Sequence, residues 1–236
     1  MRGPIALVGS GEYLPVMQDL EASLLQGRNP KFVQIPTAAA PEGDKSLDYW
    51  VSLGQSQAQR LDVEAVPVII RDRNDANSQT IVNLIEDAGL IYFSGGNPNF
   101  LANTLRGTLA WEVIHRNWLN GAALAGCSAG AMAIADHIPN LRTPWGEQTS
   151  GLGVLPHIRV LPHFDRMFAR IPDFFQKFMR VPEGVTVVGI DEDTALVGGP
   201  YDWQVQGRQS VWVLAQGERI EFTAGKSVYT PEILSS

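Results

Sequence analysis

Residues 122–135 constrain the fold of this chain more than any other segment. They begin as a short apolar run, typical of a strand buried on both faces, and end as an alanine-rich stretch that favours a helix. Between the two lies Gly126-Cys-Ser-Ala-Gly130. A strand, a G-x-S-x-G turn and a helix together are typical of a nucleophile elbow. We therefore predict that Ser128 is a nucleophile; the alternative is a tight turn in which Ser128 only caps the helix.

The segments before the elbow alternate between two patterns. Apolar runs at 4–10, 31–37, 63–70 and 89–94 are each followed by a stretch with helical periodicity. Such alternation predicts a doubly wound, mostly parallel sheet with helices on both faces and ligands at the carboxyl ends of its strands. Pro67 removes a backbone donor, so we expect the third strand at an edge or bent.

The pattern changes after the elbow helix. Residues 136–153 are predicted as a loop, and a strand at 158–162 leads into a helical stretch that reaches about residue 179, kinked at Pro172. Short β runs separated by turns follow, and we expect them to add antiparallel strands to the end of the sheet. No linker is visible, so we predict one three-layer αβα domain over residues 1–236.

Composition excludes several classes of function. The 236 residues carry a net charge of −7 without any run of Lys or Arg, so neither nucleic acid nor a membrane is an expected partner. Cys127 is the single cysteine, which excludes an intrachain disulfide. No apolar segment approaches the roughly 20 residues of a membrane span, and the first apolar run is too short for a signal sequence. We expect a cytoplasmic protein.

Two motifs that can indicate a bound cofactor or metal are incomplete. Gly9-x-Gly11 lacks the third glycine and the later acidic residue of a dinucleotide site. The acidic residues 191–193 lack the His or Cys ligands, or the EF-hand pattern, of a metal centre. We therefore expect neither a cofactor nor a metal ion.

A nucleophilic serine needs a base that an acidic residue orients. Among the four histidines, His163 is the strongest candidate because it lies at a predicted strand-to-helix turn behind Pro162. His157, at the start of a strand-like run, is the second candidate. His115 and His137 fit a solvated helix face and a helix end.

The acid is expected among Asp191, Glu192 and Asp193, which follow a buried run and so end a strand at the same edge. The N–H of Ala129, at the helix start, can donate to an oxyanion, and residues 94–97 are the natural source of a second donor. A plain turn is the alternative for their double glycine. Because the order Ser, His, acid differs from that of α/β-hydrolases, an esterase of that type is the second interpretation.

Four segments resemble the serine peptidases of the dipeptidase E and cyanophycinase group, which have the class I glutamine-amidotransferase-like fold. They are Phe-Ser-Gly-Gly-Asn at 93–97, Gly-Cys-Ser-Ala-Gly-Ala at 126–131, Pro-His-Phe at 162–164 and Gly-Ile-Asp-Glu-Asp-Thr-Ala-Leu at 189–196. They occur in the order and at the separations typical of that family, and the resemblance covers most of the chain. It implies the following roles: Ser128 as nucleophile, His163 as base, Glu192 as orienting acid, and Gly96 and Ala129 as oxyanion donors.

The resemblance also implies hydrolysis of amide bonds in short peptides, often beside aspartate. Pro162, the residue before the histidine, resembles dipeptidase E, whereas the acidic segment resembles cyanophycinase. Neither of the two named activities can therefore be assigned in full from the resemblance. Amidotransferases have cysteine where Ser128 stands, and Cys127 is one residue away and expected to point into the core. Glutaminase activity is therefore not expected. A catalytically silent, amidotransferase-like binding protein is the other interpretation.

Asn97 and Arg166 are the predicted substrate-binding residues. Arg166 lies three residues after His163, so the two can share a helix face where the guanidinium holds a substrate carboxylate. Arg170 offers a further cation, and solvated arginines paired with nearby aspartates are the alternative. We expect a small peptide substrate with an aspartyl or β-aspartyl preference, and the sequence leaves a homodimer open.

Overall fold

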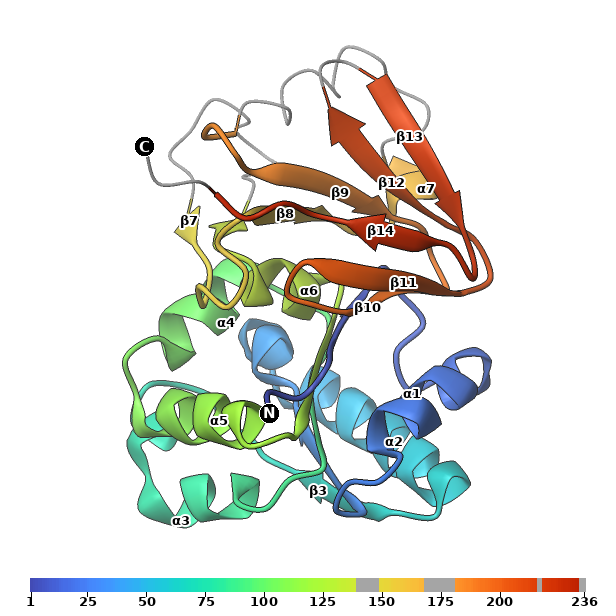
Figure 1. The fold of residues 1–236 in the computed structure, drawn as a ribbon. Coiled ribbons are helices and arrows are strands. Elements are labelled where there is room, and N and C mark those ends of the chain that lie inside the picture. Colours follow the sequence, from blue (N-terminus) through green and yellow to red (C-terminus); the bar gives the residue numbers. More distant parts are fainter. Residues whose placement is uncertain (139–148, 168–180, 216–217, 234–236) are drawn as a thin grey trace.

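The computed structural model describes residues 1–138, 149–167, 181–215 and 218–233 (Figure 1). Its main sheet has eight strands in the order β14-β11-β10-β1-β5-β4-β2-β3. Five of them are mutually parallel: β1 (Ile5–Val8), β2 (Lys31–Ile35), β3 (Glu64–Pro67), β4 (Leu90–Phe93) and β5 (Ala123–Cys127). Three antiparallel strands extend the β1 side: β10 (Thr194–Gly198), β11 (Asp202–Gly207) and β14 (Ser227–Tyr229).

Helices cover both faces of this sheet, which gives the predicted three-layer α/β fold. One face packs against α1 (Gln18–Leu25) and α2 (Asp44–Leu61). The other packs against α3 (Gln79–Val82), α4 (Pro98–Leu105), α5 (Leu109–Leu119) and α6 (Ala129–Ile134). Every side chain of β1, β4 and β5 is buried, as the continuous apolar runs predict for strands covered on both sides.

Short 3-10 turns replace parts of two predicted helices. The helical stretch expected after the first strand begins only at Pro15, because Tyr13 has a positive φ of 62° and the chain first forms the turn Pro15–Met17. The helical stretch expected after the third strand is divided into α3 and the turn Asn83–Ile85. Two further 3-10 segments, Thr37–Glu42 and Asp75–Asn77, lie between β2 and α2 and between β3 and α3. The edge position predicted from Pro67 is confirmed, since β3 ends the sheet order.

The tail of the chain divides between two sheets. The expected extension of the main sheet is right for β10, β11 and β14, but a second sheet forms in the order β13-β12-β9-β8. Its strands are β8 (Ile158–Leu161), β9 (Thr186–Ile190), β12 (Ser210–Ala215) and β13 (Glu218–Thr223). In Figure 1 this second sheet lies above the helical layers, beside β10, β11 and β14. Period-two patterning predicts a strand but not its partner, which explains the difference.

Two of the short turns in which the chain crosses between the sheets lie next to each other. Residues 191–193 join β9 to β10, and residues 208–209 join β11 to β12. The turns are bonded to each other, because the Arg208 N–H donates to the Asp193 carbonyl at 2.9 Å. Both therefore lie at the seam where the two sheets meet.

Residues 136–153, predicted as a loop, contain the small antiparallel pair β6 (His137–Ile138) and β7 (Thr149–Ser150). Of the helix expected after residue 163, the structure describes only α7 (Phe164–Met167). The predicted kink at Pro172 and the cation Arg170 lie outside the described residues. Among the described helices, none combines the length and the apolar character needed to cross a membrane.

Candidate active site

Ser128 lies in a strained turn between β5 and α6. Its φ of 50° and ψ of −108° are sparsely populated for a residue with a side chain. The Ser128 N–H donates to the Val8 carbonyl of β1 at 2.9 Å, and the Ser128 carbonyl accepts from Met132 N at 3.1 Å. Sheet and helix therefore both hold the serine in the geometry predicted for a nucleophile elbow.

The two glycines of the elbow allow close packing of backbone against backbone. A Cβ on Gly126 would lie 2.4 Å from the carbonyl carbon of Gly130, and a Cβ on Gly130 would lie 2.4 Å from the Phe93 carbonyl oxygen. Side chains at these positions would force the helix away from the strand. The G-x-S-x-G spacing is thus explained by sterics on both sides of Ser128.

His163 approaches Ser128 from the second sheet. It follows β8 by two residues, has a positive φ of 50°, and its carbonyl accepts from the N–H groups of Arg166 and Met167 at 3.1 and 2.9 Å. Its Nε2 lies 2.9 Å from Ser128 Oγ. The imidazole is therefore within hydrogen-bond reach of the hydroxyl.

Glu192 lies in the crossing turn after β9, the parallel neighbour of β8. Parallel strands end at the same edge, so His163 and Glu192 meet, and His163 Nδ1 lies 3.1 Å from Glu192 Oε1. The turn is firmly held: the Glu192 N–H donates to Asp165 Oδ1 at 3.0 Å, and the Glu192 carbonyl accepts from Gln209 Nε2 at 2.9 Å. The carboxylate position is thus set by the backbone around it.

The second oxygen of Glu192 binds Arg166. The Arg166 Nε lies 2.6 Å from Glu192 Oε2, while the arginine side chain remains 72% exposed. Each carboxylate oxygen therefore has its own partner, His163 on one side and Arg166 on the other. The structure thus gives Arg166 a contact with Glu192 that the sequence did not suggest.

The neighbouring acids point elsewhere. The carboxylate of Asp191 accepts from Trp212 Nε1 at 3.0 Å and from the Ser210 N–H at 3.2 Å, and burial raises the pKa of Asp191. Asp193 Oδ2 lies 3.8 Å from Arg208 Nη1. These contacts tie Asp191 to β12 and Asp193 to the neighbouring turn, and leave Glu192 as the acid beside the imidazole.

Residues 94–97, here called the oxyanion loop, follow β4 next to the elbow. Three of their N–H groups have backbone or side-chain partners: Ser94 donates to Ile35 O at 3.5 Å, Gly95 to Glu12 Oε1 at 2.9 Å and Asn97 to Ala38 O at 2.7 Å. Within the described chain no acceptor is found for the N–H of Gly96. That residue is exposed, has a φ of +135°, and a Cβ on it would lie 2.4 Å from Ala38 O.

The first-turn N–H groups of a helix have no intrahelical acceptor, and Ala129 is the first residue of α6. Gly96 and Ala129 thus each offer an N–H group that is available to an oxyanion near Ser128. Asn97, predicted to bind substrate, caps α4: its Oδ1 accepts from Phe100 N at 3.0 Å.

The other histidines have structural surroundings. His157 is 2% exposed, its Nε2 lies 2.9 Å from Pro200 O, and burial lowers its pKa. His115 contacts the rings of Trp111 and Trp118, and burial lowers its pKa as well. His137 lies in β6. Of the four, His163 is the one brought to Ser128.

Glu12 was not singled out in the sequence. It is 6% exposed and its Oε2 accepts from the Cys127 thiol at 2.7 Å. Cys127 itself is fully buried, as expected from its position one residue before the nucleophile, and burial raises the pKa of its thiol. A single Glu after Gly-Ser-Gly has no recognisable pattern, so only the contact identifies it.

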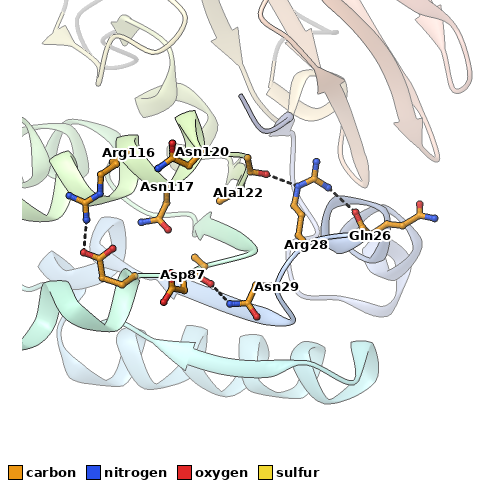
Figure 2. Close-up of a pocket in the computed structure, with 12 residues that line it drawn as sticks. Gln26, Arg28, Asn29, Asp87, Arg116, Asn117, Asn120 and Ala122 are labelled. Atoms are coloured by element: carbon orange, nitrogen blue, oxygen red, sulfur yellow. Dashed lines mark hydrogen bonds and ion pairs between the residues drawn. The ribbon is translucent and has the colours of Figure 1, made fainter. Parts of the chain in front are cut away.

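A polar hollow of about 490 Å³ lies at the amino edge of the parallel strands, opposite the candidate site (Figure 2). Its two arginines are already paired within the protein: Arg28 Nε donates to Gly121 O at 2.8 Å, and Arg116 binds Glu86. It contains no nucleophile. Among the described residues, no cluster of three or more His, Cys, Asp or Glu side chains could hold a metal ion.

The three-layer fold with a serine on a nucleophile elbow defines an enzyme of the hydrolase class. The chain belongs to peptidase family S51, whose model matches residues 5–199, and it is a serine-type peptidase. This agrees with the resemblance to dipeptidase E and cyanophycinase and not with the α/β-hydrolase interpretation.

Solved structures of similar proteins are also peptidases. A peptidase from an acI-B1 Actinobacterium is 43% identical, with a TM-score of 0.90 and 97% of both chains covered. A proposed peptidase E from Listeria monocytogenes EGD-e shares the fold at 17% identity, with a TM-score of 0.61 over 95% of this chain and 100% of that one. A search of curated proteins finds no match.

Proposed function

We propose that this serine peptidase hydrolyses amide bonds of short peptides through a Ser128-His163-Glu192 triad and an acyl-enzyme. One observation carries the proposal: an unbroken chain of contacts from Ser128 Oγ to His163 Nε2 at 2.9 Å and from His163 Nδ1 to Glu192 Oε1 at 3.1 Å. Each atom in it is of the type that proton transfer from serine requires.

The reaction follows from these positions. Ser128 Oγ attacks the scissile carbonyl carbon while His163 Nε2 takes the hydroxyl proton, and Glu192 stabilises the imidazolium through Nδ1–H. The carbonyl oxygen becomes an oxyanion that accepts from the N–H groups of Gly96 and Ala129. Collapse breaks the C–N bond as His163 returns its proton to the leaving amine. Water then attacks the acyl-enzyme by the same steps and releases the acid.

A fluorophosphonate probe tests this proposal. The probe phosphonylates a serine, with loss of fluoride, only when a base and an oxyanion site activate it, so we expect one equivalent of label per chain on Ser128. Peptide mapping identifies the labelled residue. The catalytically silent binding protein is the alternative, and a folded protein that takes up no label under conditions that saturate an active serine peptidase would favour it.

We further propose a preference for peptides with an aspartyl or other acidic residue, recognised by Arg166. Its guanidinium is held near the triad by Glu192, and its side chain is 72% exposed, so a substrate carboxylate can reach it. With a net charge of −7, the molecule as a whole does not attract an acidic substrate, so the preference depends on this local cation.

Arg166→Ala is expected to remove the preference for Asp-initiated over Ala- and Leu-initiated dipeptides, with a loss of about tenfold in kcat/KM for the Asp substrate. Because Arg166 also contacts Glu192, kcat should fall for every substrate, so the ratio between substrates is the diagnostic quantity.

Arg208→Ala is the matched control, since Arg208 is 69% exposed and lies 3.8 Å from Asp193, not on Glu192. Equal rates for all three dipeptides in the wild type, or an unchanged ratio in Arg166→Ala, would contradict the role of Arg166 and leave the Ser128 mechanism standing.

A further inference from the structure

Glu12 is a buried carboxylate that the reaction described above does not use. It lies in the loop after β1, and its two oxygens accept from different parts of the chain: Oε1 from the Gly95 N–H at 2.9 Å and Oε2 from the Cys127 thiol at 2.7 Å. Burying a carboxylate is costly unless donors reach it, and here one donor meets each oxygen. Burial also keeps the Cys127 thiol protonated, because it raises the thiol pKa.

The two donors lie directly before catalytic groups. Gly95 precedes Gly96, and Cys127 precedes Ser128. The ladder between β4 and β5 ends at the pair Phe93 and Gly126, so it does not extend to the residues that would carry out the reaction. Beyond that point, Glu12 bridges the oxyanion loop and the elbow strand with a single side chain.

The bridged segments lie close together, with little more than the space of a methyl group between Gly95 and Ser128. A Cβ on Gly95 would lie 3.7 Å from the Ser128 Cβ and 3.1 Å from Glu12 Oε1. A shift of the oxyanion loop by a fraction of this separation would move the Gly96 N–H relative to the reacting carbonyl. Displacements of about 1 Å in an active site can cost about 10²-fold in rate.

We propose that Glu12 is a positioning residue: its carboxylate spans Gly95 and Cys127 and holds the Gly96 N–H at the correct distance from Ser128 Oγ. This rests on the proposed triad and oxyanion site. The length of the Glu12 side chain matters here and its charge does not, because both contacts are hydrogen bonds accepted by two oxygens a fixed distance apart.

Two substitutions of Glu12 separate the effect of side-chain length from the effect of charge. Glu12→Asp keeps the charge but shortens the side chain by one methylene, so it cannot meet both donors. We expect its kcat to fall about 10- to 100-fold with KM within about threefold of wild type. Glu12→Gln keeps the length, accepts from Gly95 through its carbonyl and can donate to the sulfur, so its kcat should stay within about fivefold.

Glu21→Asp is the matched control. Glu21 is also buried on the α1 and α2 face, and its Oε1 accepts from the Tyr13 N–H at 3.2 Å; burial raises its pKa to about 8. The same shortening there removes a buried contact without touching the oxyanion loop. A loss of kcat in Glu21→Asp as large as in Glu12→Asp would overturn the proposal, and so would an equal loss in Glu12→Gln and Glu12→Asp.

Substitution of Cys127 tests the other end of the bridge and does not depend on whether Glu12→Asp folds. Cys127→Ala removes the donor and should lower kcat about three- to tenfold, whereas Cys127→Ser retains a hydroxyl donor and should restore most of it. Equal kcat values in the alanine and serine variants would overturn the bridge.

Fluorophosphonate labelling distinguishes failure of this inference from failure of the proposed function. A labelled wild type with an unaffected Glu12→Asp rate overturns only the bridge. A wild type that neither takes up label nor hydrolyses peptides overturns the triad, and the bridge with it.

Discussion

Ser128→Ala is expected to lower kcat by about 10³-fold or more while the protein stays folded. Removing the hydroxyl removes the only atom that forms the acyl bond, whereas alanine keeps the Cβ and fits the same space. The strained turn is held by backbone contacts, including Ser128 N to Val8 O at 2.9 Å, and these do not involve the hydroxyl. Steady-state hydrolysis of a dipeptide series measures kcat, and circular dichroism measures whether the variant is folded.

The neighbouring Cys127 provides the contrast. Its thiol is buried and bound to Glu12, so it does not face a substrate. If blocking the thiol abolished turnover while Ser128→Ala left it intact, the nucleophile would be misassigned and the serine mechanism would be wrong.

Glu192→Gln is expected to lower kcat by about 10²-fold or more with a smaller change in KM. Each oxygen of Glu192 has its own partner: Oε1 lies within hydrogen-bond distance of the imidazole, and Oε2 forms an ion pair with Arg166. A glutamine has one acceptor and one donor group, so either orientation of its amide sets an N–H against a donor. If the amide nitrogen faces His163, the imidazole loses the tautomer that accepts the serine proton.

Asp191→Asn and Asp193→Asn are the controls for that substitution. The Asp191 carboxylate accepts hydrogen bonds from Trp212 Nε1 and the Ser210 N–H. Replacing this carboxylate should therefore lower the melting temperature, while kcat changes by less than about threefold. A larger loss of kcat in Asp191→Asn than in Glu192→Gln would reverse the assignment of the acid.

The sequence predicts the main sheet well because each of its parallel strands can be recognised from a short, continuous stretch of residues. Each parallel strand is an apolar run followed by a helical pattern, and Pro67 marks the edge strand through its missing donor. The tail is harder to predict because its short strands carry the same alternation whichever sheet they join. No sequence pattern around residues 191–193 indicates that the chain passes from one sheet to the other there.

The candidate site divides in the same way. The elbow can be recognised from its glycine spacing, since both glycines are required within one turn. His163 and Glu192 lie 35 and 64 positions after Ser128. The strand-to-helix turn behind Pro162 favours His163, whereas the resemblance to a family points to Glu192 among the three neighbouring acids. The contact of Arg166 with Glu192 and that of Glu12 with Gly95 depend on tertiary packing, which no local pattern encodes.

The proposed triad is divided between the two sheets, and this has a consequence for substitutions far from the site. Ser128 is attached to β5, whereas His163 and Glu192 follow β8 and β9, and within the part of the chain that the structure describes no backbone ladder joins these two groups of strands. The 2.9 Å separation of hydroxyl and imidazole is instead maintained by one apolar core that includes Leu196 of the main sheet with Val160 and Ile190 of the second. Laboratory evolution of this enzyme can therefore tune turnover through volume changes at that seam, without altering any residue that touches the peptide.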